Sequence, residues 1–347
     1  MKRKIIVSMF LVFALCVSSA SLWAGGGKEE AAAPPAPAPV SALSGKKVIV
    51  ADANSTHHLN LYVAYEKGLF KKRGLEVEIT QTSGGVAAVV GGEADIVFNC
   101  PTGVITPIAK GQSIIIIGQV KSPCTSVLVV PANAPIKNPT DLKGLQIAGL
   151  SNTCCAVLLI RDALANQYKT TFELVTLAPG AALAALEAGQ VKGAILEEPF
   201  VAQALLINDA QGKPKYRTLF DGHSDANGDG KTDANLAGEN PPCRTINANT
   251  TFIKERLGDA KVFIEAIEEA DKLILSNPVA ADIVDIAEKY VKVPRQAIIN
   301  SNPKLGFTIK LATEQLKGYA QVLVNQKTID TNPGDALFAP EFKGITW

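Results

Sequence analysis

The sequence has few histidines, no cysteine pair in CxxC spacing, little net charge and only one long apolar run. Three histidines and no CxxC pair leave few ligands to complete a zinc site. A formal net charge of +1 excludes the strongly basic surface that nucleic acid binding requires, so no nucleic acid partner is expected. The apolar run ends near residue 17, and no later segment is long and apolar enough to predict a membrane span.

The N-terminal segment, residues 1–24, has the order of a secretory signal peptide. Cations at residues 2–4 precede an apolar run at 5–17 and small residues up to Ala24. The run is shorter than the roughly twenty residues that span a bilayer. We expect cleavage after Ala20 or Ala24, and hence export to the periplasm. Lipidation of Cys16, which would tether the protein to the membrane, is the alternative, although Leu15 fits poorly before a lipidated cysteine.

Residues 25–45 are rich first in glycine and then in alanine and proline, and such sequence forms an extended linker. The roughly 300 residues that follow exceed one comfortable hydrophobic core and predict two lobes. We assign residues 46–125 and 245–347 to lobe 1. Residues 126–244 are assigned to lobe 2, with an insertion at 221–242.

Short apolar strands alternate with helical patterns along both lobes. This alternation predicts an α/β protein in which mostly parallel sheets are flanked by helices. The predicted strands are 47–51, 75–80, 95–98 and 114–120, then 126–130, 145–148, 173–177 and 194–196, with a returning strand at 244–247. The predicted helices begin near Leu59 and Gly84 and include 155–166, 181–188, 259–276, 278–290 and 313–325.

Polar residues follow several predicted strands. In open parallel sheets, ligands bind at the carboxyl ends of strands, where helix N-termini supply free N–H groups. Capping of the adjacent helices alone would explain any single loop, but six such loops at one edge favour a small-molecule site. The candidate ligand-binding residues are Asn54, Thr56, His57, His58, Ser83, Gly84, Asn99, Thr102, Ser122, Ser151, Asn152, Thr153 and Glu197.

Four motifs resemble the substrate-binding proteins of NitT/TauT-type ABC transporters, which take up nitrate, taurine, sulfonates and thiamine precursors. They are LYVAYEKGLFKKRGLEV at 61–77, GGEADI at 91–96, PTDLKGLQIA at 139–148 and AALEAGQVKGAILEEPF at 184–200. The resemblance extends from about residue 46 to the C-terminus. Each motif is moderately specific, and their common order strengthens the match.

The resemblance implies a type II periplasmic-binding-protein fold, with two hinge-linked lobes that close on a small-molecule ligand. It also implies a membrane permease and ATPase as partners, no enzymatic activity, and a monomer. Within the family, His58 resembles the histidine of pyrimidine-type thiamine-precursor binders, and Glu197 lies where a pocket acid meets the ligand. An imidazole and a carboxylate could pair with an aminopyrimidine edge, whereas a sulfonate or nitrate pocket would avoid the acid. Otherwise His57 and His58 simply start a helix.

Five cysteines remain beyond Cys16, and an odd number leaves at least one thiol unpaired in a single chain. One disulfide is compatible with export, but the sequence does not select its partners. Cys154 and Cys155 open a predicted helix, where they either pack as small residues or hold a soft metal. They also faintly resemble the cysteine-rich iron motif of a pyrimidine synthase on this fold, which makes such an enzyme the alternative function.

An Asp/Asn/Gly-rich loop in the predicted insertion resembles the front of an EF-hand calcium loop. The acid expected at its twelfth position is replaced by Leu236, so a metal-free turn is the alternative. No other cofactor is expected. The candidate structural Ca²⁺ ligands are Asp225, Asn227, Asp229, Lys231 and Asp233.

Overall fold

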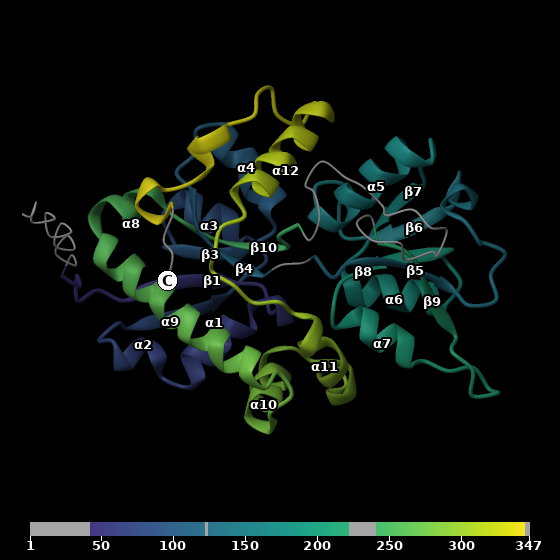
Figure 1. Cartoon of the computed structure of the whole chain (residues 1–347), viewed down its shortest axis with the longest axis horizontal. Helices are drawn as coiled ribbons and strands as arrows, with labels where there is room; N and C mark the ends of the chain where they lie inside the picture. The colour runs from purple at the N-terminus through teal and green to yellow at the C-terminus, as the bar shows by residue number, and fades with distance from the viewer. Residues whose placement is uncertain (1–41, 122–123, 222–240, 344–347) are drawn as a thin grey trace, which may run out of the picture. The chain divides into compact units, whose positions relative to one another are not determined.

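The computed structural model describes residues 42–121, 124–221 and 241–343, which contain two five-stranded sheets (Figure 1). The first sheet has the order β2-β1-β3-β10-β4, and only β10 runs antiparallel to its neighbours. Its strands are β1 (Val48–Asp52), β2 (Val77–Gln81), β3 (Ile96–Asn99), β4 (Ile115–Lys121) and β10 (Arg244–Ala248). We call this sheet and its helices lobe 1.

The second sheet, in lobe 2, has the order β7-β6-β8-β5-β9. Here β5 is antiparallel to both of its neighbours, and β6 pairs in parallel with β7 and β8. Its strands are β5 (Val127–Pro131), β6 (Gln146–Gly149), β7 (Glu173–Thr176), β8 (Gly193–Leu196) and β9 (Tyr216–Phe220). The mostly parallel α/β architecture expected from the sequence is therefore confirmed.

Helices cover both faces of each sheet (Figure 1). In lobe 1, side chains of α1 (Leu59–Glu66), α2 (Leu69–Lys72), α9 (Leu257–Ser276) and α10 (Ala281–Tyr290) share one apolar cluster with the sheet. On the opposite face lie α3 (Gly85–Gly91), α4 (Pro101–Ala109) and α12 (Thr313–Asn325). Short 3₁₀ turns follow α12 along the chain. Lobe 2 has α5 (Cys155–Gln167) on one face and α6 (Pro179–Glu187) and α7 (Phe200–Leu206) on the other. The remaining helices are α8 (Thr250–Glu255) and α11 (Arg295–Ser301).

The predicted elements agree with these bounds to within a few residues, and the predicted helix 313–325 coincides with α12. Strand β9 was missed. It lies at the edge of its sheet, where its Arg217 and Thr218 are only half-buried, so its apolar pattern is weak. The short helices α4, α7, α8 and α11 were also missed, because six to nine residues give too short a helical pattern to recognise.

The chain passes between the sheets twice, once between β4 and β5 and once between β9 and β10. Cys124 lies on the first of these connections, and Cys243 immediately precedes β10 on the second. One apolar cluster continues across this region from α4 and α12 of lobe 1 to α5 of lobe 2. None of the described helices is long and apolar enough to cross a membrane.

Candidate functional site

A pocket of about 510 Å³ lies where loops of the two lobes meet. Lobe 1 contributes the loop after β1, Ser83 before α3, and the residues that end β3. Lobe 2 contributes the residues that follow β8 and those that begin α6 and α7. Six of the candidate ligand-binding residues line this pocket. They are Asn54, Thr56, His58, Ser83, Asn99 and Glu197.

The loop after β1 places His58 on the pocket wall. Strand β1 ends in Asp52, which is only 1% exposed, and Asn54 then turns the chain with a positive φ of 53°. Asparagine tolerates this left-handed conformation better than most residues. Nδ1 of His58 lies 2.6 Å from Oδ1 of Asp52. The carboxylate therefore fixes both the ring orientation and the tautomer, with the proton on Nδ1.

Three further hydrogen bonds hold the Asp52 carboxylate. Oδ2 accepts from the Tyr62 hydroxyl at 2.8 Å, from the backbone N–H of Asn54 at 3.0 Å and from Nε2 of Gln81 at 3.1 Å. Burial by itself raises the pKa of Asp52, but the bonds from His58, Tyr62 and Asn54 outweigh it and lower that pKa to about 2. Asp52 is therefore a permanent anion at neutral pH.

Nε2 of His58 is buried and has no hydrogen-bonding partner among the described residues. Buried polar atoms are rarely left without a partner, because losing water without compensation costs about 1–3 kcal/mol. The ring also packs against Phe98, with centroids 5.5 Å apart. Because His58 lines the pocket, its free nitrogen is suited to accept a hydrogen bond from a ligand.

Asn99 offers a donor beside this histidine. Its Oδ1 accepts from the N–H of Cys100 at 2.6 Å, while its Nδ2 has no hydrogen-bonding partner among the described residues.

The two lobes also bond to each other next to the pocket, where Thr56 Oγ1 donates to the carbonyl of Glu198 at 3.1 Å. Lys304 of lobe 1 forms a 2.7 Å ion pair with Oε1 of the same glutamate.

Arg244, the first residue of β10, reaches from lobe 1 to Glu197 of lobe 2. Its Nη2 lies 2.8 Å from Oε2 and 3.1 Å from Oε1 of Glu197. Nδ1 of His57 lies 3.6 Å from Oε2 of the same carboxylate. Burial raises the pKa of Glu197 above its usual value, and the positive charge of Arg244 opposes that rise. The carboxylate assigned to the ligand is thus already paired within the protein.

Nη1 of Arg244 faces a group of buried thiols. It lies 2.9 Å from Sγ of Cys100 and 3.5 Å from Sγ of Cys243. Hydrogen bonds from the thiols of Cys154 and Cys155 hold the pKa of Cys100 well below its usual value, and the charge of Arg244 adds to this effect. All five cysteines of the described residues are buried, and none forms a disulfide.

Several candidate residues lie outside the pocket lining. Thr102 is buried and donates to the carbonyl of Thr153, so it joins the lobes. Ser151 and Thr153 contact each other, and Asn152 accepts from Arg161 at 2.8 Å. His57 is buried, Gly84 is the N-cap of α3, and neither of them lines the pocket. Ser122 and the candidate calcium ligands (Asp225, Asn227, Asp229, Lys231 and Asp233) lie outside the described residues.

Two residues that organise the site were missed from the sequence. Asp52 was missed because the predicted strand ended one residue early, at Ala51. The sequence predicts Arg244 only as the start of a strand, because its partner Glu197 is 47 positions away along the chain. The one available signal for Asp52 was an acid at a strand end, six residues before a histidine.

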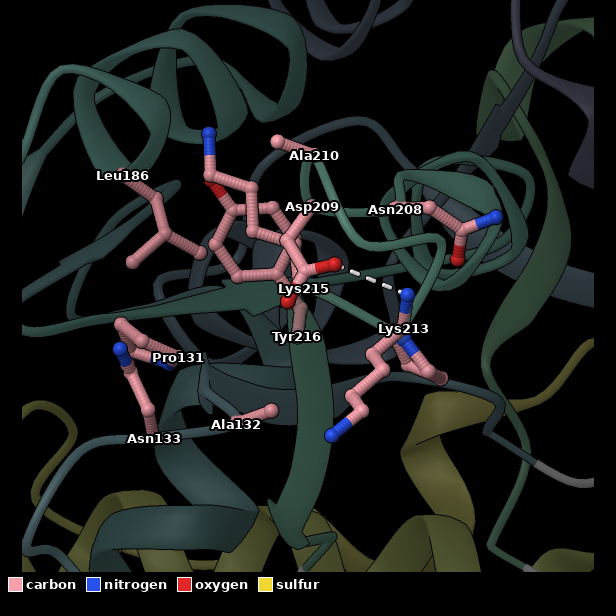
Figure 2. Close-up of a pocket in the computed structure, with 11 residues that line it drawn as sticks. Pro131, Ala132, Asn133, Leu186, Asn208, Asp209, Ala210, Lys213, Lys215 and Tyr216 are labelled. Atoms are coloured by element: carbon pink, nitrogen blue, oxygen red, sulfur yellow. Dashed lines mark hydrogen bonds between the residues drawn. The ribbon is translucent and has the colours of Figure 1, made fainter.

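A second pocket of about 630 Å³ lies within lobe 2 (Figure 2). It is formed around the turn that Asn208 and Pro214 close by a β-bridge. Figure 2 shows the Asp209 side chain pointing at the backbone nitrogen of Lys213, a 2.9 Å hydrogen bond. Oδ1 of Asp209 also accepts from Gln211, so its carboxylate serves to build the turn. None of the candidate ligand-binding residues lines this second pocket.

The family model described as NMT1/THI5-like matches residues 55–281 of this chain. No curated protein matches this chain significantly.

Three solved structures are similar to this chain. The periplasmic aliphatic sulphonate binding protein SsuA from Escherichia coli has 19% identity and a TM-score of 0.65, over 82% of this chain and 89% of that one. The periplasmic nitrate-binding protein NrtA from Synechocystis PCC 6803 has 14% identity and a TM-score of 0.61, over 82% of each chain. A ligand binding component of an ABC-type import system from Staphylococcus aureus, with zinc bound, has 15% identity and a TM-score of 0.69, over 87% and 99%. At these identities the likeness establishes the periplasmic-binding-protein fold.

Proposed function

Because this chain belongs to the NMT1/THI5-like family, we propose that it is an extracytoplasmic solute-binding protein that delivers a small polar molecule to an ABC importer. Similar solved structures include binding proteins for sulphonate and nitrate. The observation that carries the proposal is the pocket between the lobes, which is lined by His58, whose Nε2 has no hydrogen-bonding partner among the described residues. A site of this kind binds a ligand by hydrogen bonds without needing a reactive group.

The charges of the pocket favour a neutral ligand over an anion. The charged residues that line it are Glu197, Glu198 and Arg244. Arg244 is paired with Glu197, and Glu198 with Lys304, so the described lining has no cation free to neutralise a sulfonate or nitrate. A buried anion without a counter-charge would lose more free energy of hydration than its contacts with the pocket would restore.

The hydrogen-bonding groups and rings of the pocket suit a small heterocycle. His58 offers an acceptor at Nε2, Asn99 offers a donor at Nδ2, and Phe98 and Phe200 offer apolar ring surfaces. An aminopyrimidine presents donors and acceptors on one planar edge, and its ring can stack on an aromatic side chain. We therefore place a pyrimidine-type thiamine precursor ahead of a sulfonate, taurine or nitrate.

The mechanism is closure of two hinge-linked lobes around the ligand. Residues 46–125 and 245–347 form one lobe and 126–244 the other, except that Arg244 already belongs to β10 in the sheet of lobe 1. A ligand that contacts both lobes stabilises the closed form by its higher affinity for that form. The bonds from Thr56 and Lys304 to Glu198 join the lobes beside the pocket and would strengthen closure. The closed form is then recognised by a membrane permease, and an ATPase drives uptake.

Export is proposed from the N-terminal sequence. Residues 2–4 and the apolar run at 5–17 direct the chain across the cytoplasmic membrane, and residues 25–45 link the folded part to the processed end. The protein would act as a monomer in the periplasm, either free or tethered through Cys16.

The test is calorimetric titration of the purified protein with an aminopyrimidine, taurine and nitrate, together with mass spectrometry of compounds released on denaturation. We expect a binding isotherm for the aminopyrimidine only. Tighter binding of taurine or nitrate would contradict the ligand class but not the transport role. Catalytic turnover of a bound pyrimidine would contradict the transport role and favour the pyrimidine-synthase-like enzyme.

A further inference from the structure

Five cysteines from separate parts of the chain gather at the boundary between the lobes. Cys100 precedes α4 in lobe 1, and Cys154 and Cys155 begin α5 in lobe 2. Cys124 and Cys243 lie on the two connections that carry the chain from one sheet to the other. Each of the five is at most 7% exposed. Packing of small residues alone does not require five cysteines from separate parts of the chain to meet at one place.

The thiols form two triads that share one member. The Sγ atoms of Cys100, Cys154 and Cys155 lie within 4.8 Å of one another, and so do those of Cys124, Cys155 and Cys243. Sγ of Cys155 is 3.3 Å from Sγ of Cys100. Two sulfurs bound to one zinc ion at about 2.3 Å in tetrahedral geometry are about 3.8 Å apart. The thiols are therefore already spaced for a shared metal ion, with only small adjustments.

Arg244 supplies the charge that such a site needs. Its guanidinium lies 2.9 Å from Sγ of Cys100 in a buried environment, where a thiolate without a counter-charge would be costly. Metal binding requires deprotonated thiols, and the nearby cation offsets part of their negative charge. Sulfur-only ligand sets favour soft, thiophilic ions over calcium or magnesium.

We propose that Cys100, Cys154 and Cys155, together with Cys124 and Cys243, form a buried thiolate site for a thiophilic ion, Cu(I) or Zn(II), that links the two lobes. Both ions have filled d shells and accept three or four thiolates. The site goes beyond solute binding, because it uses none of the groups that face the proposed ligand except Cys100.

Two of the five thiol-bearing residues line cavities. Cys100 and Arg244 both line the pocket of about 510 Å³ between the lobes, and Cys154 and Glu197 both line a small cavity of about 10 Å³. Nδ1 of His57 and a carboxylate oxygen of Glu197 also lie within 4.8 Å of Sγ of Cys243. These two groups give an entering ion further ligands between the pocket and the thiols.

The test uses the purified protein, reduced and stripped of metal with a chelator under anaerobic conditions. Zn(II) and Cu(I) are each titrated against a chromophoric competitor, and Cu(I) binding is also followed by thiolate charge-transfer absorption. We expect at least one ion per chain. The Cys155→Ser variant removes the shared thiol and should weaken binding by at least about 100-fold, because even loss of an outer-shell partner costs 10–100-fold.

The control variant is Ala163→Ser, which adds a hydroxyl to the same buried helix and keeps every thiol. It should bind metal as the native protein does, and thermal unfolding shows whether each variant is folded. If Cys155→Ser fails to fold, Cys100→Ser and Cys154→Ser give the same comparison. Three outcomes would overturn the proposal: no metal bound at micromolar concentration, unchanged binding in the triple Cys100/Cys154/Cys155→Ser variant, or iron with acid-labile sulfide as the native occupant.

Discussion

Arg244 of lobe 1 holds Glu197 of lobe 2 through one guanidinium nitrogen, at 2.8 Å from one carboxylate oxygen and 3.1 Å from the other. The same guanidinium contacts Sγ of Cys100 through its other terminal nitrogen. One buried cation therefore connects the ligand pocket, the cluster of buried cysteines and the boundary between the lobes. Removing any of its partners should affect stability as well as binding.

Glu197→Ala should destabilise the protein by about 3–5 kcal/mol, because it leaves the Arg244 guanidinium buried without its carboxylate. Glu197→Gln keeps an acceptor for Arg244 and should cost less. Urea unfolding at pH 7 measures both. The matched control is Arg295→Ala, which removes exposed ion pairs with Asp285 and Glu288 and should cost far less, because solvent screens such pairs. Equal losses for Glu197→Ala and Arg295→Ala would contradict this view of the pair.

His58→Ala should abolish ligand binding while leaving the protein folded, because it removes the free acceptor on the pocket wall. At an aminopyrimidine concentration of about 100 times its Kd, the native protein should gain about 2.7 kcal/mol of stability. The variant should gain almost none, as measured by ligand-dependent thermal unfolding. Ser151→Ala is the control, since Ser151 lies outside the pocket lining and should leave the gain unchanged. A normal gain in His58→Ala would place the ligand elsewhere.

Asp52 should make the protein less stable in acid. Its folded pKa is lowered from 3.8 to about 2, so its contribution is complete above the unfolded pKa and is lost as the pH falls from about 4 to about 2. The difference corresponds to about 2 kcal/mol. Asp52→Asn cannot titrate, so the native protein's stability advantage over it should shrink by that amount between pH 5 and pH 2. Urea unfolding at both pH values measures the advantage, and an unchanged difference would refute the assignment.

The sequence predicted the elements but not the contacts between them. Strands such as 47–51 and the helix 313–325 have strong apolar periodicity, so local pattern alone located them. The loops after β1, β3 and β8 were also placed at one pocket, because strand ends in parallel sheets share an edge. That rule does not say which side chains face inward. Ser151, Asn152 and Thr153 follow β6, yet they bond within their own loop or to Arg161 and α4.

Long-range pairing explains what was missed. The cysteines at 100, 124, 154, 155 and 243 show no metal-ligand spacing along the sequence, and they meet only because the chain crosses between the sheets twice. Arg244 and Glu197 likewise belong to different sheets. No local pattern carries such information, since each residue by itself resembles a packing cysteine or an ordinary strand end.

Gly85 should be required where α3 approaches the first sheet next to the pocket. A Cβ at this position would lie 2.8 Å from Cγ2 of Val97, closer than atoms of this kind approach in folded proteins. Gly85→Ala should therefore destabilise the protein by about 1–3 kcal/mol through overpacking. It should also shift Ser83, which lines the pocket, and weaken ligand binding. Chemical unfolding and ligand titration measure the two effects.

Gly91→Ala in the same helix is the matched control. Nothing lies within 4 Å of a Cβ at Gly91, and its backbone conformation suits any residue. Because alanine favours a helix over glycine, this change should be neutral or stabilise by up to about 1 kcal/mol. Opposite signs for two identical substitutions six residues apart would show that the contact with Val97, not helix propensity, decides the outcome. If both variants are stabilised, α3 can move away from the sheet, and the position of Ser83 does not depend on Gly85.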